Sequence, residues 1–236
     1  SVTPSTTANA ILGVAGVDDF IEIACEVAPS LRDAIEGVAR WFGLAGRPAV
    51  SLSLAPGADG VQVLHVQRTD SLTEDPSVAV PVVVGFLSEA GAALAVSVDG
   101  GAPVTQHTVV LAGRTTQVSL AASEPIVLSP LRGYSAPVDL AVEMSAAHLA
   151  TLVQHDTDAF ARWWASEELM IRVVDAHRRG DQAAASAALA ALAEALRQAA
   201  ATETDPVLLA QLLALPDEFM LGDREPRIDV DGVANG

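Results

Sequence analysis

Val-Ala-Val-Pro-Val-Val-Val-Gly-Phe-Leu, residues 78–87, is almost continuously apolar and rich in β-branched side chains. Such a run is typical of a buried strand. Two residues interrupt it, Pro81 and Gly85. Proline cannot donate to a strand ladder, so we place Pro81 at the start of the strand or at a sheet edge.

Short strands are predicted on both sides of this run. Residues 49–54 alternate with a period of two, and a turn leads back along residues 61–67. Asp99-Gly100-Gly101 is a hairpin signal between residues 92–98 and 104–111. Further strands are expected at residues 115–120, 126–128 and 138–142. This spacing predicts an Ig-like antiparallel β-sandwich over residues 48–142.

Helices are predicted on either side of the sandwich. Two are expected between residues 17 and 44, the first ended by Pro29. From residue 145 onward, short links between helices favour a stack like the start of an α-solenoid. Its expected N-caps are Ser145, Asp156 or Asp158, Asp181 and Asp205. The predicted fold is α+β and multidomain, with helical parts at 1–47 and 143–236 around the sandwich at 48–142.

The composition excludes two classes of partner. The 236 residues are 50% hydrophobic, enough for a substantial core. The formal net charge is −17, and all basic side chains are arginines. Such an acidic surface repels phosphate backbones and anionic lipid, so we exclude nucleic-acid and membrane-surface binding.

Cysteine content and apolar runs bear on the compartment. Cys25 is the only cysteine, so neither an intramolecular disulfide nor a Cys-based zinc site can form. This fits a reducing compartment, and we expect the cytoplasm. The longest apolar run has about ten residues, whereas a membrane span needs about twenty. Residues 1–4 do not resemble a signal peptide, and the missing initiator Met indicates a trimmed or processed chain.

A search for catalytic motifs finds none. Zinc peptidases need His-Glu-x-x-His, and none of the five histidines has that spacing. His148 and His155, with Asp156 and Asp158 nearby, either bind a divalent ion or form a polar junction between helices with an N-cap; we favour the junction. Gly-x-Ser-x-Gly and the phosphate-binding loop are also absent from the sequence.

Three other groups have a structural and a functional interpretation. Trp163-Trp164 is either a stacking platform or, at helical spacing with Phe160, part of the core, which we favour. The pairs Glu22/Glu26 and Glu167/Glu168 resemble acid–base pairs, but without a cleft they are solvated surface. We therefore assign no catalytic, cofactor-binding or metal-binding residue.

Several segments resemble M1-family zinc aminopeptidases of the bacterial aminopeptidase N type. The strongest is Leu131-Arg132-Gly133-Tyr134-Ser135-Ala136-Pro137-Val138, similar to the family's Leu-Arg-Gly-Phe-Ser-Ala-Pro-Val. A second similar segment is His155-Asp156-x-Asp158-x-Phe160-x-Arg162-Trp163. The remaining similar segments are Asp18-Asp19-Phe20, Arg40-Trp41-Phe42, Gly46-Arg47-Pro48, Gln67-Arg68-Thr69, the strand at 81–87 and Leu213-x-Leu215-Pro216-x-Glu218. Their order and spacing hold over residues 18–233.

The resemblance implies a non-catalytic part of such an enzyme. Residues 1–47 resemble the end of the family's catalytic domain, and we expect the zone at 17–48 to bind the missing part of that domain. The family's Gly-x-Met-Glu-Asn and His-Glu-x-x-His motifs are absent, so we predict that the chain is inactive alone and that zinc belongs to the parent's catalytic domain. In such enzymes the sandwich separates the catalytic domain from a helical superhelix that restricts peptide entry. We expect the superhelix to be cut off after Gly236. Arg132 is expected to be an ion-pair hub that holds loop carbonyls or Asp156 in place.

Two alternatives stay open. One is a free-standing module that binds a partner peptide at a strand edge or helical groove. The other is an enzyme built around His148, His155 and Asp156. The expected partners are the catalytic domain of the same polypeptide and, in the parent, peptides; exposed apolar patches favour self-association of the isolated chain. An upstream reading frame with His-Glu-x-x-His would favour the non-catalytic part of an aminopeptidase over the free-standing module.

Overall fold

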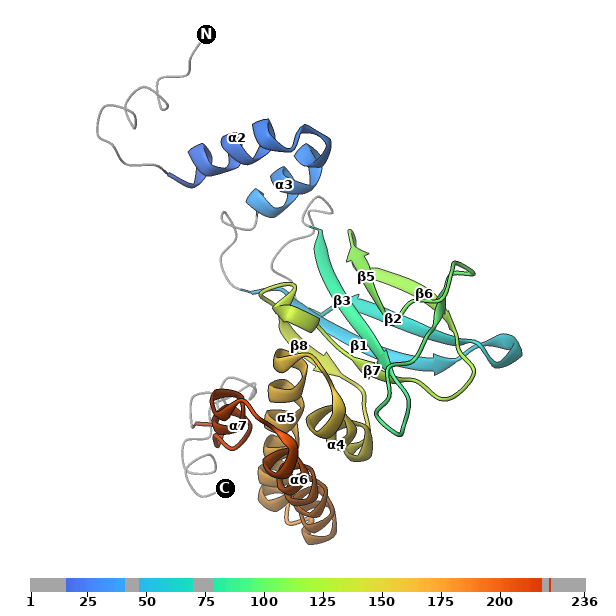
Figure 1. Ribbon diagram of the computed structural model, residues 1–236, viewed down its shortest axis with the longest axis vertical. Coiled ribbons are helices and arrows are strands. Elements are labelled where there is room, and N and C mark those ends of the chain that lie inside the picture. Colours follow the sequence, from blue (N-terminus) through green and yellow to red (C-terminus); the bar gives the residue numbers. More distant parts are fainter. Residues whose placement is uncertain (1–15, 41–46, 70–78, 218–220, 222–236) are drawn as a thin grey trace.

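The computed structural model describes residues 16–40, 47–69, 79–217 and 221. Figure 1 shows the N-terminal helices, the β-strands and a group of C-terminal helices packed against the sheets. Helices and sheets occupy separate parts of the sequence, so the predicted α+β class is confirmed. No helix among the described residues is both long and apolar enough to cross a membrane.

In the described part of the chain, eight strands form two sheets. The five-stranded sheet has the order β4-β6-β2-β1-β8, and the three-stranded sheet has the order β5-β3-β7. The strands are β1 (Ala49–Pro56), β2 (Gln62–Arg68), β3 (Val80–Leu87), β4 (Ser97–Val98), β5 (Gln106–Leu111), β6 (Thr115–Ala121), β7 (Val127–Ser129) and β8 (Asp139–Val142). The core between the sheets is made mainly of Val and Leu, with Phe86 its largest fully buried side chain.

The apolar run of β3 has a simple physical reason. Val80, Val82, Val84 and Phe86 face the core between the sheets. On the opposite face, Leu87 and its strand partner Val127 belong to a second core, shared with the C-terminal helices. Because β3 is covered on both faces at this end, it does not alternate between apolar and polar residues.

Two strand pairings differ from the sequence-based expectation. Asp99 and Gly100 do form a tight turn with positive φ at both residues, but Val96 and Val104 make only one isolated bridge beside it. Instead, the N–H of Asp99 donates to the carbonyl of Ser119, and the carboxylate of Asp99 accepts the N–H of Ser119. These two bonds lie next to the pairing of β4 with β6 and support it. In addition, β8 pairs with β1 in parallel, because the chain reaches β1 from the other sheet after β7.

The C-terminal helices are α4 (Ala146–His155), α5 (Ala159–Arg178), α6 (Gln182–Thr202) and α7 (Pro206–Leu212). Four side chains cap them as expected: Ser145, Asp158, Asp181 and Asp205 each accept a backbone N–H of the first turn. Leu149, Leu152, Leu169 and Leu192 pack together where α4, α5 and α6 meet. The helices therefore form one packed group with its own core.

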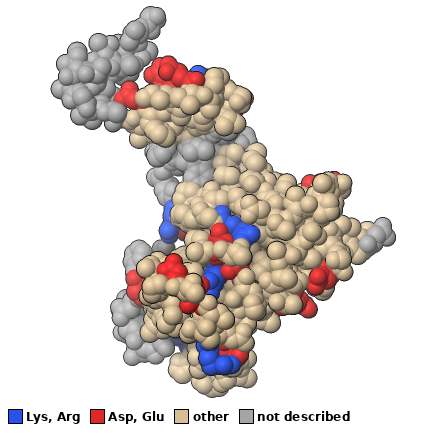
Figure 2. All heavy atoms as spheres, viewed as in Figure 1, with Lys and Arg blue, Asp and Glu red and all other residues tan. Residues whose placement is uncertain are grey.

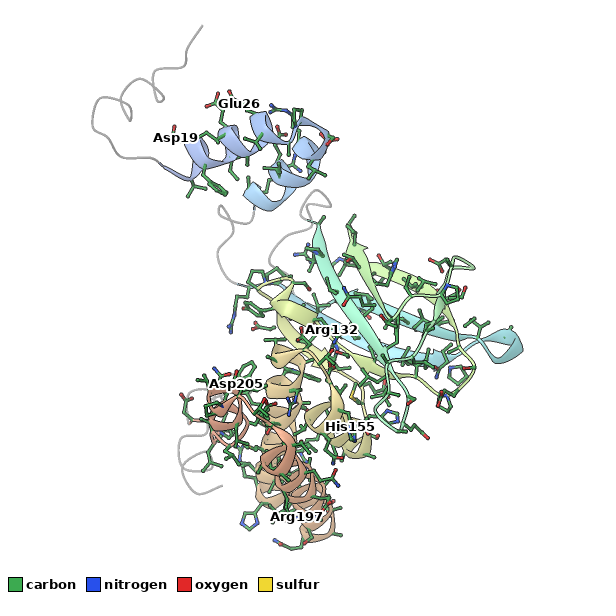
Figure 3. The ribbon with its side chains drawn as sticks, viewed as in Figure 1. Asp19, Glu26, Arg132, His155, Arg197 and Asp205 are labelled. Carbon is green, nitrogen blue, oxygen red and sulfur yellow. The ribbon has the colours of Figure 1, made fainter. Side chains whose placement is uncertain are left out.

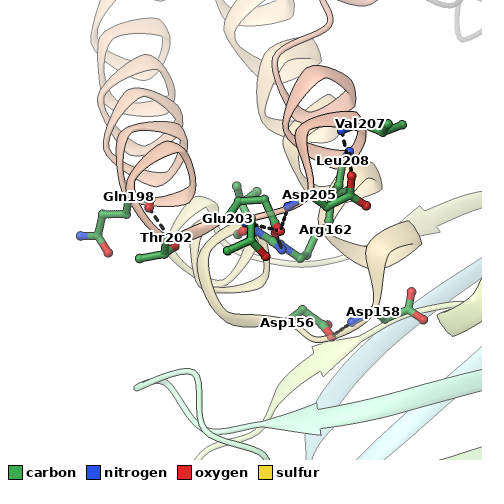
Figure 4. A network of polar contacts seen from close by, with 11 residues as sticks. Asp156, Asp158, Arg162, Gln198, Thr202, Glu203, Asp205, Val207 and Leu208 are labelled. Carbon is green, nitrogen blue, oxygen red and sulfur yellow. Dashed lines mark hydrogen bonds and ion pairs between the residues drawn. The ribbon is translucent and has the colours of Figure 1, made fainter.

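Arg162 connects three of these helices. Its Nε donates to Val153 O at the end of α4, 3.0 Å away, and its Nη1 pairs with Glu203 at the end of α6. Glu203 Oε1 also accepts the backbone N–H groups of Thr204 and Asp205 at 2.8 Å (Figure 4). Arg162 is 8% exposed, so the backbone carbonyl of Val153 and the carboxylate of Glu203 bind it largely away from water.

The N-terminal helices are α2 (Val17–Val27) and α3 (Arg32–Ala39), joined by a 3₁₀ turn at Pro29–Leu31. Gly16 N donates to Asp19 Oδ2 at the start of α2. Cys25 is buried, whereas Phe20, Ile23 and Val27 on the same helix are 58–81% exposed. Helix α2 therefore presents an apolar stripe to the outside.

Glu203 should make the free energy of unfolding depend on pH. Hydrogen bonds from Asp205 N–H and Arg162 lower the pKa of Glu203 below its ordinary value. A carboxylate with a lowered pKa in the folded state contributes stability above its unfolded pKa, about 4.3, and loses it as the pH falls through the folded pKa. Glu203→Gln should therefore unfold more easily than the wild type at pH 7, and this difference should shrink in acid.

Urea unfolding at several pH values measures this difference. Glu124→Gln, at an exposed position between β6 and β7, is the control and should match the wild type within about 0.5 kcal/mol. A difference between Glu203→Gln and the wild type that stays constant from pH 7 into the acid range would contradict the expectation.

Candidate functional site: the Arg132 junction

The connection from β7 to β8 is the centre of the junction between the sandwich and the helices. After Ser129 the chain turns through Leu131, Gly133 and Tyr134, all with φ between 51° and 64°. Non-glycine residues rarely adopt this conformation, so two of these positions carry backbone strain. Leu131 is buried in the sandwich core. Ser135 Oγ accepts the N–H of Val83, a residue of β3 that lies beyond the part paired with β7. The loop is thus fixed to β3 on its sandwich side.

Arg132 points from this loop to the helices (Figure 3). Its Nη2 donates to Asp156 Oδ1 at 2.9 Å and to Thr157 Oγ1 at 2.6 Å. The side chain of Asp156 is fully buried, and that of Arg132 is 14% exposed. A buried carboxylate needs a charged partner, so this ion pair fixes the loop to the turn between α4 and α5. The expected hub role of Arg132 towards Asp156 agrees with this geometry.

Aspartates complete the contact from the helix side. Asp158 Oδ1 caps α5 through Ala161 N, and its Oδ2 accepts Gly133 N at 2.8 Å. Asp156 Oδ1 accepts Asp158 N at 2.8 Å (Figure 4). The same oxygen accepts Nη2 of Arg132. The two sequence segments 131–135 and 155–158, which are distant in the sequence, therefore bind each other directly.

Two glycines make room for this contact. An added Cβ on Gly85 of β3 would lie 2.6 Å from Arg132 Cδ and 3.1 Å from Arg132 Nε. An added Cβ on Gly91, in the turn after β3, would lie 2.3 Å from the ring of His155. Both are closer than real contacts allow, so each glycine is required for a side chain of the junction to pack against the sandwich.

Aromatic rings extend the junction along α5. The rings of Tyr134 and Phe160 lie 5.1 Å apart, and those of Phe160 and Trp163 lie 5.6 Å apart. These three residues line an open hollow of about 780 Å³ beside β8. Trp164 is 5% exposed and belongs to the helical core. Trp163 is partly buried and packs against the same core, and both tryptophans also line the hollow, so the core interpretation holds for Trp164 and in part for Trp163.

The histidines do not form a metal site among the described residues. His155 packs against Gly91, and Asp156 is engaged by Arg132. His148 Nε2 lies 3.8 Å from Glu89 Oε1, an acidic residue that the sequence did not single out. In the described ranges no group of three or more His, Cys, Asp or Glu side chains is placed to hold an ion. The ion pair of Asp156 and the N-cap formed by Asp158 agree with the favoured interpretation, a polar junction between helices with an N-cap.

Only one of the two acidic pairs, Glu22/Glu26, is the solvated surface that the sequence predicts, whereas Glu167 and Glu168 are partly buried. Glu22 and Glu26 are exposed on α2, and the acidic atoms over this helix are visible in Figure 2. Glu168 pairs with Arg172 at 3.1 Å, and both Glu167 and Glu168 line the hollow. What the geometry of the junction can do is mechanical: it fixes the helices against the sandwich.

Sequence reasoning missed four residues of the junction: Thr157, Ser135, Gly85 and Gly91. Gly85 did leave a signal, because a glycine inside a strand pattern marks a close approach of another chain segment. Thr157 and Ser135 contribute single hydroxyl groups, which no spacing rule distinguishes from surface residues. Gly91 lies in an ordinary turn, so nothing in the sequence indicated its contact with His155.

Removing Arg132 should strongly destabilise the protein. Arg132→Ala leaves the Asp156 carboxylate buried without its partner, so we expect a loss of about 3–5 kcal/mol. Arg132→Lys should restore little, because one ammonium cannot reproduce the planar guanidinium. Arg197→Ala, in the exposed pair with Glu194, is the matched control and should cost at most about 1 kcal/mol. Thermal unfolding of the three variants tests this, and an unchanged melting temperature for Arg132→Ala would exclude the hub role.

Gly85→Ala should displace Arg132. We expect a cost of about 1–3 kcal/mol, typical of overpacking. Gly113→Ala is the control, since an added Cβ there has no neighbour within 4 Å. If the clash with Arg132 is the cause, Gly85→Ala combined with Arg132→Ala should cost less than the sum of the two single changes. Full additivity in urea unfolding would show that Gly85 acts in another way.

Parts of the chain are similar to known proteins. Residues 146–235 match the family model described as "Domain of unknown function (DUF3458_C) ARM repeats". Aminopeptidase N of Caulobacter vibrioides is 39% identical over 97 residues, which is 40% of this chain and 11% of that protein. The chain thus spans a small part of the relative it matches.

The fold has a counterpart among solved structures. Legionella pneumophila aminopeptidase A, solved in complex with aspartic acid, superposes with a TM-score of 0.73 at 20% identity. The match covers 94% of this chain and 24% of that protein. The resemblance drawn from the sequence is therefore confirmed, and the chain corresponds to the C-terminal region of M1-family aminopeptidases.

Proposed function

We propose that this chain is the non-catalytic part of a zinc aminopeptidase, in which the sandwich separates the catalytic domain from the helices and the helices restrict peptide entry. The observation that carries the proposal is the Arg132 junction. A group of helices can limit access to a distant site only if its orientation is fixed. The buried ion pair, the shared Asp158 and the two glycine contacts supply that fixed orientation.

The matched relatives support a larger parent molecule. The 97 residues matched to the aminopeptidase N are 11% of that protein, and the structural match covers 24% of the aminopeptidase A. In this proposal zinc and peptide hydrolysis belong to a separate catalytic domain of the same polypeptide, and the chain alone is inactive. The single cysteine supports a cytoplasmic location.

The apolar stripe of α2 is the proposed contact with that catalytic domain. Phe20 is 67% exposed and Val27 is 81% exposed, both on one short helix whose other positions carry acids, including Asp19 and Glu26 (Figure 3). A contiguous exposed apolar stripe bordered by polar residues is typical of an interface. Phe20 is the best anchor, because aromatic side chains dominate the binding energy of interfaces.

A free-standing peptide-binding module is the second candidate. Its support is β8, which among the described strands has only β1 as a neighbour and lines the hollow beside Phe160 and Trp163. An extended peptide can add to such an edge. The reading frame upstream of Ser1 distinguishes the two: His-Glu-x-x-His there supports the aminopeptidase, and a start codon near Ser1 supports the module.

Binding in trans tests the leading proposal. The isolated chain should not hydrolyse alanyl substrates, and it should bind a separately produced catalytic domain encoded upstream of it. Val27→Asp should weaken this binding at least about tenfold, since a buried unpaired charge costs more than 1.4 kcal/mol. Val207→Asp, the same change at an exposed valine of α7, should bind normally.

Isothermal titration calorimetry gives both affinities. Equal weakening by Val27→Asp and Val207→Asp would remove α2 as the contact. Peptide turnover by the isolated chain, with stoichiometric zinc, would overturn the proposal that the chain is non-catalytic.

A further inference from the structure

Three buried polar atoms at the Arg132 junction have no hydrogen-bond partner among the described residues. They are Ser129 Oγ, Arg132 Nε and Asp156 Oδ2. A buried polar group without a hydrogen-bond partner destabilises the folded protein, so three at one place require an explanation.

The three atoms lie close together. Ser129 is the direct partner of Gly85 in the antiparallel β3–β7 pair, so their side-chain positions are on the same face of the sheet. Directly opposite Cβ positions lie about 4.5–5.5 Å apart. Arg132 Nε is 3.1 Å from the Cβ position of Gly85, which places it near the Ser129 hydroxyl. Asp156 Oδ2 belongs to the carboxylate whose other oxygen binds the guanidinium of Arg132 at 2.9 Å.

We propose that one internal water molecule binds here and bridges Ser129 Oγ, Arg132 Nε and Asp156 Oδ2. The chemistry of the three atoms selects the ligand. Arginine Nε–H can only donate, a carboxylate oxygen can only accept, and a hydroxyl can do either. A cation would face the guanidinium and an anion would face the carboxylate. Water donates and accepts at once, and about three hydrogen bonds is the usual number for a buried water.

The water would belong to the junction itself. It would join β7, the loop after it and the turn before α5, and Arg132 itself connects the last two directly. A buried water with partners on several segments is part of the structure and is costly to remove.

A high-resolution crystal structure of the chain tests the proposal. We expect one well-ordered density peak within hydrogen-bond distance of all three atoms. A structure in which Arg132 Nε binds Asp156 Oδ2 directly, with no peak beside Ser129, would overturn it.

Nuclear magnetic resonance gives a second measurement in solution. The Nε–H of Arg132 should show a cross-peak to a long-lived water. Arg162 is the matched internal control, because its Nε–H is also buried but donates directly to Val153 O at 3.0 Å. It should show no such cross-peak, and equal behaviour of the two arginines would contradict the site.

Ser129→Ala identifies the role of the hydroxyl. This small change removes one of the three partners, so occupancy of the peak should fall and the cross-peak of Arg132 Nε–H should weaken. A water with unchanged position and occupancy in Ser129→Ala would show that Ser129 does not bind it and would overturn the three-way bridge.

Discussion

The contact between Arg132 and Asp156 is the constraint on which the rest of the arrangement depends. Arg132 belongs to a strained loop fixed to the sandwich by Leu131 and Ser135, and Asp156 is buried in the turn between two helices. Either charge alone would be costly in this environment, because burial removes the water that would otherwise solvate it. The two segments are therefore stable only in each other's presence. A single orientation of helices and sandwich satisfies both.

Much of the fold follows from local sequence signals, and the exceptions have physical reasons. The strands, the helix caps at Ser145, Asp158, Asp181 and Asp205, and the turn at Asp99-Gly100 all follow from patterns of a few residues. Strand partners do not, because β4 is attached to β6 by one aspartate and one serine that no periodicity links. The parallel pairing of β8 likewise depends on how the chain crosses between sheets, which is a long-range property.

Only some residues of the junction could be predicted from the sequence, again because the others act through contacts distant in the sequence. Arg132 and Asp156 carry charge, and a charge beside an apolar stretch is noticeable in a sequence. The surfaces that receive them are glycines and small hydroxyl residues, which look like ordinary turns. Gly91 opposite His155 illustrates this, since the requirement is the absence of a side chain. Resemblance to a family supplied what pattern alone could not, by marking segments 131–138 and 155–163 together.

Burial of β3 on both faces has a further consequence for how the polypeptide assembles. Leu87 and Val127 are strand residues, yet they complete the core of the helices. If the helices separate from the sheet, these side chains become exposed to water. If the three-stranded sheet unfolds, the helices lose part of their hydrophobic core. Sheet and helices should therefore open and close as one cooperative unit, so the change from strands to helices near residue 143 is a boundary in sequence but not in folding.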